Sequence, residues 1–175
     1  MTAHPGILNP GTVNLRVLGY LGRALSYELS AVQQYLTHAA LAELWGMEEI
    51  ASHFRQEANE EQAHAQRLIA RLLEFGAIPN GSQLTPVRAG LSLIELLQAD
   101  QLLEQRAVAL YREAAQYCAL IDAPDDQALF AALHDEELSH VRQLDAWLQQ
   151  LRSPPTGIMG HQSHTTHRPP ITDDT

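Results

Sequence analysis

The chain has 175 residues, a length that suits a single domain with a sizeable apolar core. Its formal net charge is −10 and its eleven basic residues are all Arg, so the clustered positive charge that nucleic-acid binding needs is missing. The single cysteine, Cys118, excludes an internal disulfide and a four-cysteine metal site, and no stretch resembles a membrane span or a secretory leader, so we expect a cytoplasmic protein.

Four helices are predicted in chain order, because Leu and Ala recur at helical spacing along most of the chain. The predicted helices span about residues 13–44, 47–75, 92–121 and 125–151. Gly46 and Gly76 are expected to end the first two, and Ser92, with Glu95 three positions on, is a plausible cap of the third. Asp122-Ala123-Pro124 is expected to be a break before the fourth helix.

The segments outside the helices are rich in Pro and Gly or in polar residues. Residues 1–12 are expected to form an N-terminal arm, 13–152 a four-helix bundle and 153–175 a flexible C-terminal tail. The tail contains His161, His164 and His167, whose spacing would suit a metal clip, although a polar tail with chance histidines is the favoured interpretation.

One pattern occurs twice with identical spacing: a lone Glu, followed further along the chain by Glu-x-x-His. The first copy comprises Glu28, Glu61 and His64, and the second comprises Glu104, Glu137 and His140. One constant offset relates each member of the first copy to its counterpart, and the same offset relates identical residues elsewhere, including Tyr35 and Tyr111. This internal repeat indicates two similar helical hairpins that pack into one bundle with approximate two-fold symmetry.

The spacing within each hairpin predicts where the six side chains lie. Glu28 precedes the turn at Trp45 by nearly the same length of chain by which Glu61 and His64 follow it, so an antiparallel pair of helices brings them level in mid-helix. Two-fold symmetry makes the third helix parallel to the second. The linker 76–91 must therefore cross the length of the bundle, and when extended it reaches at most about 50 Å.

These residue types indicate a dinuclear metal site. Four buried carboxylates without cations would be strongly unfavourable, since two unit charges about 4 Å apart repel by about 4 kcal/mol even at an effective dielectric near 20. Two divalent cations neutralise them, and one imidazole per metal completes a donor set suited to iron or manganese, with zinc possible. Glu61 and Glu137 are placed to bridge the two metals. Glu28 with His64 would bind one metal, and Glu104 with His140 would bind the other. The alternative interpretation is that the four acids are surface carboxylates without a metal.

The doubled motif is the signature of ferritin-like di-metal carboxylate proteins. The chain resembles the bacterioferritins most closely in segments 28–35 (ELSAVQQY), 60–64 (EEQAH), 75–80 (FGAIPN) and 135–140 (DEELSH). The resemblance implies an all-α, ferritin-like bundle with a long crossover loop, two Fe ions per subunit at the six residues, and a ferroxidase that oxidises Fe(II) with O₂ or H₂O₂. It also implies a self-associated shell of 24 subunits that stores ferric mineral.

Three departures from the family pattern change these expectations. Gln62 stands where bacterioferritins place the haem-binding Met, so we expect no Met-ligated haem from this subunit, although a haem-binding sister subunit could supply it. Gln56 stands where the family has a His near the site on the inner surface. The Ser-Pro-Pro tail replaces the short fifth helix.

Other polar residues near the motif have competing interpretations. Tyr35 and Tyr111 could hydrogen-bond to ligands or donate electrons. Core packing with a satisfied hydroxyl is equally favoured for Tyr35 and more favoured for Tyr111. Glu60 and Glu136 could steer iron or orient a ligand, but a solvated-face role is favoured. The alternative function is a stand-alone Fe or Mn redox enzyme, such as a peroxidase or catalase.

Overall fold

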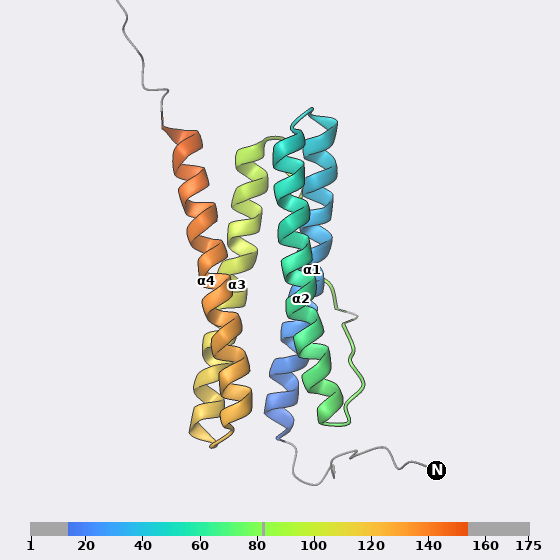
Figure 1. Cartoon of the computed structure of the whole chain (residues 1–175), viewed down its shortest axis with the longest axis vertical. Helices are drawn as coiled ribbons and strands as arrows, with labels where there is room; N and C mark the ends of the chain where they lie inside the picture. Colours follow the sequence, from blue (N-terminus) through green and yellow to red (C-terminus); the bar gives the residue numbers. More distant parts are fainter. Residues whose placement is uncertain (1–13, 82, 154–175) are drawn as a thin grey trace, which may run out of the picture.

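A computed structural model describes residues 14–81 and 83–153. The four helices are α1 (Leu15–Leu44), α2 (Glu48–Glu74), α3 (Leu93–Leu120) and α4 (Pro124–Arg152). They pack side by side as a bundle, and no strand occurs in the described part of the chain (Figure 1). The all-α, four-helix prediction is therefore confirmed. The predicted arm over 1–12, and all of the predicted tail beyond Ser153 with its three histidines, lie outside the described residues.

The helix ends follow local signals, with one correction. Gly46 and Gly76 adopt φ of 74° and 71°, the left-handed conformation in which a residue without Cβ ends a helix at little cost. Ser92 caps α3 by accepting a hydrogen bond from the Glu95 backbone N–H at 3.3 Å. Pro124 does not belong to the break as predicted but is the first residue of α4, where a missing N–H removes no helical hydrogen bond.

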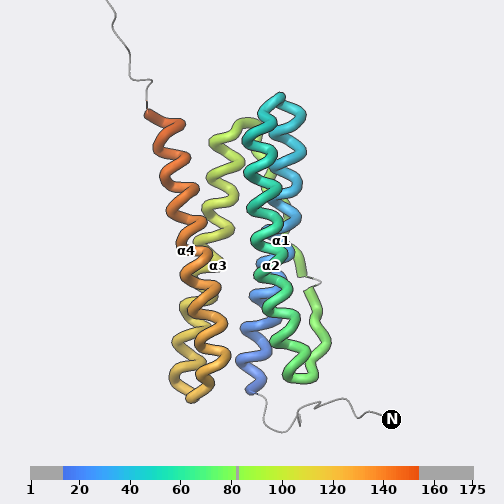
Figure 2. The backbone as a smooth tube through the Cα atoms, in the orientation of Figure 1, coloured from blue at the N-terminus to red at the C-terminus, as the bar shows by residue number. Residues whose placement is uncertain are grey.

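The helices form two antiparallel hairpins, α1–α2 and α3–α4, joined by a crossover segment. Figure 1 shows this segment returning along the outside of the bundle, so that α3 runs in the same direction as α2. The backbone trace in Figure 2 shows the same path. Backbones lie close within each hairpin and between α1 and α3, whereas those of α2 and α4 have few close approaches. The contacts between α2 and α4 are therefore made by side chains.

The crossover segment is tied to α1 by polar contacts. The backbone N–H of Thr85 donates to Ser30 Oγ at 2.9 Å, and that of Arg88 donates to the Gln34 side chain at 3.3 Å. His38 Nε2 lies 2.9 Å from the carbonyl oxygen of Arg88. These contacts satisfy backbone groups of a segment without secondary structure of its own.

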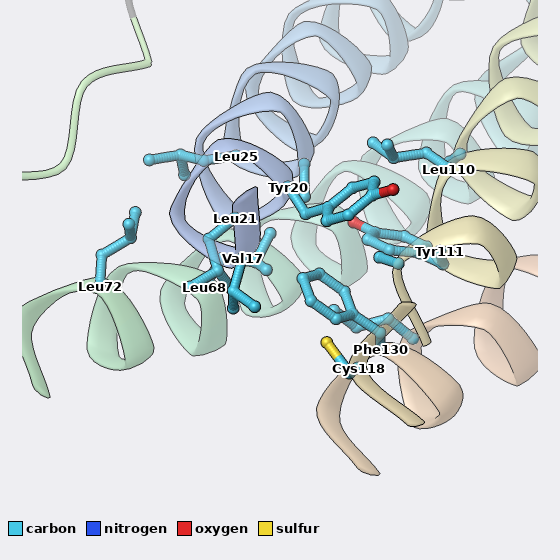
Figure 3. Packing of buried hydrophobic residues seen from close by; sticks show 14 of the residues in the cluster. Val17, Tyr20, Leu21, Leu25, Leu68, Leu72, Leu110, Tyr111, Cys118 and Phe130 are labelled. Carbon is cyan, nitrogen blue, oxygen red and sulfur yellow. The ribbon is translucent and has the colours of Figure 1, made fainter. Parts of the chain in front are cut away.

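The apolar core is divided into two clusters along the bundle axis. The lower cluster, part of which Figure 3 shows, surrounds Tyr20, Leu21, Leu68, Tyr111 and Phe130. The upper cluster surrounds residues of the other halves of the helices: Tyr35, Phe54, Leu96, Leu97 and Leu148. Each helix contributes to both clusters and is interrupted between them by buried polar residues. No helix in the described part of the chain is long and apolar enough to cross a membrane.

Candidate metal centre

Buried carboxylates and imidazoles fill the space between the two apolar clusters. Each helix contributes at this level: Glu28 from α1, Glu61 and His64 from α2, Glu104 from α3, Glu137 and His140 from α4. None of the six is more than 5% exposed. The structure thus brings together all the residues that the repeat singled out, and at the predicted level. Their role as metal ligands is not tested by this arrangement and stays a prediction.

The six side chains form two overlapping groups of potential ligand atoms. One group combines Glu28 and His64 with the pair Glu61 and Glu137. The other combines Glu104 and His140 with the same pair. Within each group the four atoms lie within 4.8 Å of one another, and the two imidazole rings stack at 5.9 Å with 17° between their planes. The arrangement suits two neighbouring metal ions that share the Glu61 and Glu137 carboxylates.

Six inward-facing atoms of this cluster have no hydrogen-bond partner among the described residues. They are both carboxylate oxygens of Glu61 and of Glu137 and the Nδ1 atoms of His64 and His140. A buried polar atom without a partner costs about 1–3 kcal/mol, and more where it is charged. Their lone pairs converge on the space that two cations would occupy, so the residues present fit a pair of metal ions.

Without metal, burial and the mutual contacts of the six side chains shift their pKa values so that the cluster holds protons. Burial raises the pKa of Glu28 and of Glu104 well above the ordinary range of a carboxyl. Burial acts in the same direction on Glu137, but contacts with the two imidazoles outweigh it and lower the pKa of Glu137. Burial opposes charge on His140, yet Glu137 and Glu61 raise its pKa to about 11. The metal-free cluster therefore balances carboxylates with imidazolium ions.

The same forces act on the remaining pair, Glu61 and His64. Burial tends to raise the pKa of Glu61, as does the nearby Glu137, but contacts with the imidazoles leave it lowered. Burial opposes charge on His64, while Glu137, Glu28 and Glu61 raise its pKa well above the ordinary imidazole range. Both imidazoles must lose a proton before Nδ1 can bind a metal.

Two tyrosines reach across the bundle to the outer carboxylates. The Tyr35 hydroxyl of α1 donates to Glu104 Oε1 of α3 at 2.5 Å. Its repeat mate Tyr111 of α3 donates to Glu28 Oε1 of α1. Both tyrosines are buried in the core with a satisfied hydroxyl, and in each case the acceptor is a predicted ligand, so the hydrogen-bonding alternative holds for both residues. The offset that they share with the ligands was the signal that linked them.

The acids that precede the motif residues also contact the centre. Glu60 Oε2 lies 3.2 Å from His140 Nε2, and Glu136 Oε2 lies 2.8 Å from His64 Nε2. The favoured interpretation of Glu60 and Glu136 as solvated-face acids is therefore incomplete, since each is part-buried and touches an imidazole. Glu57 lies one turn from Glu61, and its burial raises the pKa of its carboxyl to about 7. By contrast, Gln56 and Gln62 are exposed.

Sequence reasoning missed one buried polar network. His38 Nδ1 lies 2.9 Å from Asp100 Oδ2, and neither side chain is exposed. Gln34 donates to the other Asp100 oxygen at 2.8 Å. Because His38 and Gln34 also bind Arg88, the network joins α1, α3 and the crossover segment. Its residues are not matched by identical residues in the other copy of the repeat, which is why comparison of the two copies could not reveal it.

Comparisons with known proteins agree with the fold. Residues 18–153 match the family model of the ferritin-like domain. A bacterioferritin of Rhodobacter capsulatus is 39% identical over 126 residues, which are 72% of this chain and 78% of that protein. One of Brucella melitensis is 35% identical over 136 residues, 78% of this chain and 84% of the other.

A solved structure shows the same similarity in three dimensions. The structure of the R. capsulatus bacterioferritin superposes with a TM-score of 0.77 at 36% identity. The match covers 79% of this chain and 86% of the other. That protein has a metal-free dinuclear site and a haem iron.

Proposed function

The chain belongs to the bacterioferritins, within the ferritin-like proteins, and on that premise we propose that it stores iron and that its buried centre oxidises Fe(II) to Fe(III). The oxidant is O₂ or H₂O₂, and the ferric product is deposited as mineral inside an oligomeric shell. Iron is both the substrate and the stored cargo. The same donor set also suits manganese and can accommodate zinc.

The convergence of unpartnered buried ligand atoms carries this proposal. Four carboxylates and two imidazoles would be a costly cluster in an apolar bundle unless cations compensate them. The structure supplies no Lys or Arg between the inner carboxylates, and the only cations available from its described residues are protonated imidazoles. Two divalent ions compensate all four carboxylates and leave both imidazoles neutral.

Each ligand has a distinct role in the proposal. Glu61 and Glu137 lie in both ligand groups and would be shared by the two ions. Glu28 with His64 would hold one ion, and Glu104 with His140 would hold the other. Tyr35 and Tyr111 keep the Glu104 and Glu28 carboxylates oriented by donating hydrogen bonds.

The chemistry needs two electrons and two protons. Two bound Fe(II) ions give one electron each, which reduces O₂ to H₂O₂ with two protons, or H₂O₂ to two waters with two protons. The chain's own contribution is to hold both ions side by side in a site that lacks bulk water, so that both electrons are delivered in one encounter. The apolar clusters above and below the centre exclude water along the bundle axis.

The proposal extends to assembly and to haem. We expect 24 copies to form the shell, with the bundle of residues 13–152 as its wall and the segments 1–12 and 153–175 as arm and tail. Gln62 cannot replace the thioether of Met as an iron ligand, so this subunit binds no Met-ligated haem unless a sister subunit supplies the ligand. The protein is expected to act in the cytoplasm.

Sizing and iron oxidation test the proposal. The full chain should elute as a shell near 24 times its 19.4 kDa, and anaerobic Fe(II) followed by air should give a soluble ferric core. A monomer or dimer that decomposes peroxide catalytically but accumulates no mineral would favour the stand-alone redox enzyme instead.

Two substitutions test the centre itself. Glu61→Ala and Glu137→Ala should abolish the fast phase of Fe(II) oxidation, because each removes a ligand shared by both ions. Glu48→Ala, at an exposed carboxylate in the first turn of α2, is the matched control and should oxidise Fe(II) at the wild-type rate. Unchanged fast oxidation in both ligand variants would refute the site assignment.

A further inference from the structure

The two imidazoles of the centre are each contacted on their outer edge by a carboxylate from the opposite hairpin. His64 on α2 has its Nε2 atom 2.8 Å from Oε2 of Glu136 on α4. His140 on α4 has its Nε2 atom 3.2 Å from Oε2 of Glu60 on α2. Glu60 and Glu136 are related by the same offset as the ligands, so the two contacts are copies of one arrangement.

These contacts bear on which nitrogen carries the proton. A neutral imidazole has one N–H, and only the other nitrogen can bind a metal. In both rings Nδ1 faces an inner carboxylate, at 2.8 Å from Glu137 Oε1 for His64 and 3.1 Å from Glu61 Oε1 for His140, while Nε2 faces Glu60 or Glu136. When the inner carboxylates bind metal they no longer accept the ring proton, so the acceptor at Nε2 stabilises the Nε2–H tautomer and leaves the Nδ1 lone pair available.

We infer that Glu60 and Glu136 are positioning residues, each of which holds the proton of the opposite hairpin's metal-binding histidine on Nε2 and fixes the ring's orientation. The inference rests on the proposed function, because it assumes that Nδ1 of His64 and His140 binds metal. It also implies that neither hairpin forms its half of the centre alone. Each half needs a carboxylate from the other.

Both carboxylates are themselves held, which separates them from freely solvated acids. Their side chains are 43% exposed, so water competes for them. Arg67 binds Glu136 through contacts of 2.9 and 2.7 Å to its two oxygens, and Gln56 donates to Glu60 Oε1 at 3.0 Å. Each acid therefore has one oxygen directed at an imidazole and a second contact that limits its rotation.

The two supports are not equivalent. Glu136 is held by the cation of Arg67, whereas Glu60 is held by the neutral amide of Gln56. Residue 143, which is the repeat mate of Arg67, is Gln. Arg67→Ala should therefore lower the affinity for the metal ion bound by His64 and leave the affinity for the ion bound by His140 unchanged.

Metal affinity is the first test, with Co(II) as the probe and anaerobic titration of the metal-free full chain followed by its visible absorption. The wild-type chain should take up two Co(II) ions per subunit. Glu136→Ala should lower the affinity for one of the two ions by about 10- to 100-fold, and Glu60→Ala should lower the affinity for the other ion by a similar factor. Glu136→Gln, which keeps an oxygen acceptor without the charge, should lose less than the Ala variant. Glu48→Ala is the matched control and should bind like the wild type.

The tautomer is the second test, because a purely structural role would not change it. Solid-state ¹⁵N spectra of the Zn(II)-loaded chain with labelled histidine should show two Nε2–H signals typical of a carboxylate partner. In Glu136→Ala, one of these signals should shift toward the value of a water-bonded imidazole while sizing and circular dichroism stay unchanged.

The outcomes separate the two proposals. Wild-type affinities and ¹⁵N shifts in both Ala variants would overturn the positioning role while leaving the metal centre intact. An equal loss of Co(II) affinity in Glu48→Ala would also overturn the positioning role, because removal of any acidic charge would then explain the loss. A wild-type chain that binds no Co(II) would refute the proposed metal centre and this inference together.

Discussion

Loading the centre with two divalent ions should release about four protons per chain near pH 7. In the metal-free protein, His140 has a pKa of about 11 and the pKa of His64 is raised further, so both rings are protonated. The raised pKa values of Glu28 and Glu104 favour neutral carboxyls. All four groups must give up a proton to become ligands.

The expected pH dependence follows from this count. Two protons released per ion make the apparent metal affinity fall by about 100-fold for each unit that the pH drops, which is about 2.7 kcal/mol per ion. The dependence should weaken as the pH rises through about 11, the pKa of His140, because that ring then loses its proton without the metal.

Proton release can be measured directly by adding Zn(II) to the weakly buffered, metal-free chain with a pH indicator. Glu48→Ala should release as many protons as the wild type, since it changes an exposed acid. Fewer than two protons per chain would contradict protonated imidazoles and refute the reasoning. Release of only two would show that Glu28 and Glu104 are already ionised.

Three further predictions concern stability. The metal-free chain should lose unfolding free energy as the pH rises from about 6.5 toward 11, because the raised pKa of His140 stabilises the fold only while the ring is protonated; a thermal midpoint that rises over this range would contradict it. Gly46→Ala should destabilise the chain by about 1 kcal/mol because φ at Gly46 is 74°. Gly19→Ala, within the second turn of α1 and with open space around an added Cβ, should instead stabilise the chain by up to about 1 kcal/mol. Denaturant midpoints that shift in the same direction in both variants would refute this contrast. Asp100→Ala should cost at least about 2 kcal/mol in chemical denaturation, because it leaves the buried polar groups of His38 and Gln34 without their acceptor at about 1–3 kcal/mol each; a cost below about 1 kcal/mol would show that water replaces the carboxylate.

Much of the fold could be predicted because its signals are local. Helical recurrence of Leu and Ala, the two glycines and the Ser92 cap depend on residues within a turn of one another, and all four helices were placed to within about two residues at each end. Pro124 was misplaced because proline breaks a helix interior but is compatible with its first turn. The distinction depends on where the helix starts, which the pattern alone leaves uncertain by a few residues.

The candidate centre could be predicted because the repeat puts the same residue types at the same spacing in both hairpins. Equal spacing about the turn brings Glu28 level with Glu61, and the second copy does the same for Glu104 and Glu137. Levels along a bundle axis follow from the rise per residue, so no tertiary information is needed to obtain them. The residues' burial followed from their apolar neighbours on the same helical face.

By itself, therefore, the sequence determined the helices, the repeat and the level at which the six acidic and imidazole groups meet. Only the tertiary structure decided which groups contact them from outside: Tyr111 with Glu28, Glu136 with His64, and the His38–Asp100 pair that secures the crossover segment. Those contacts join different helices and depend on how far each helix is rotated about its axis and how closely it packs. Rotation and separation are set by the whole core at once, so no local spacing encodes them.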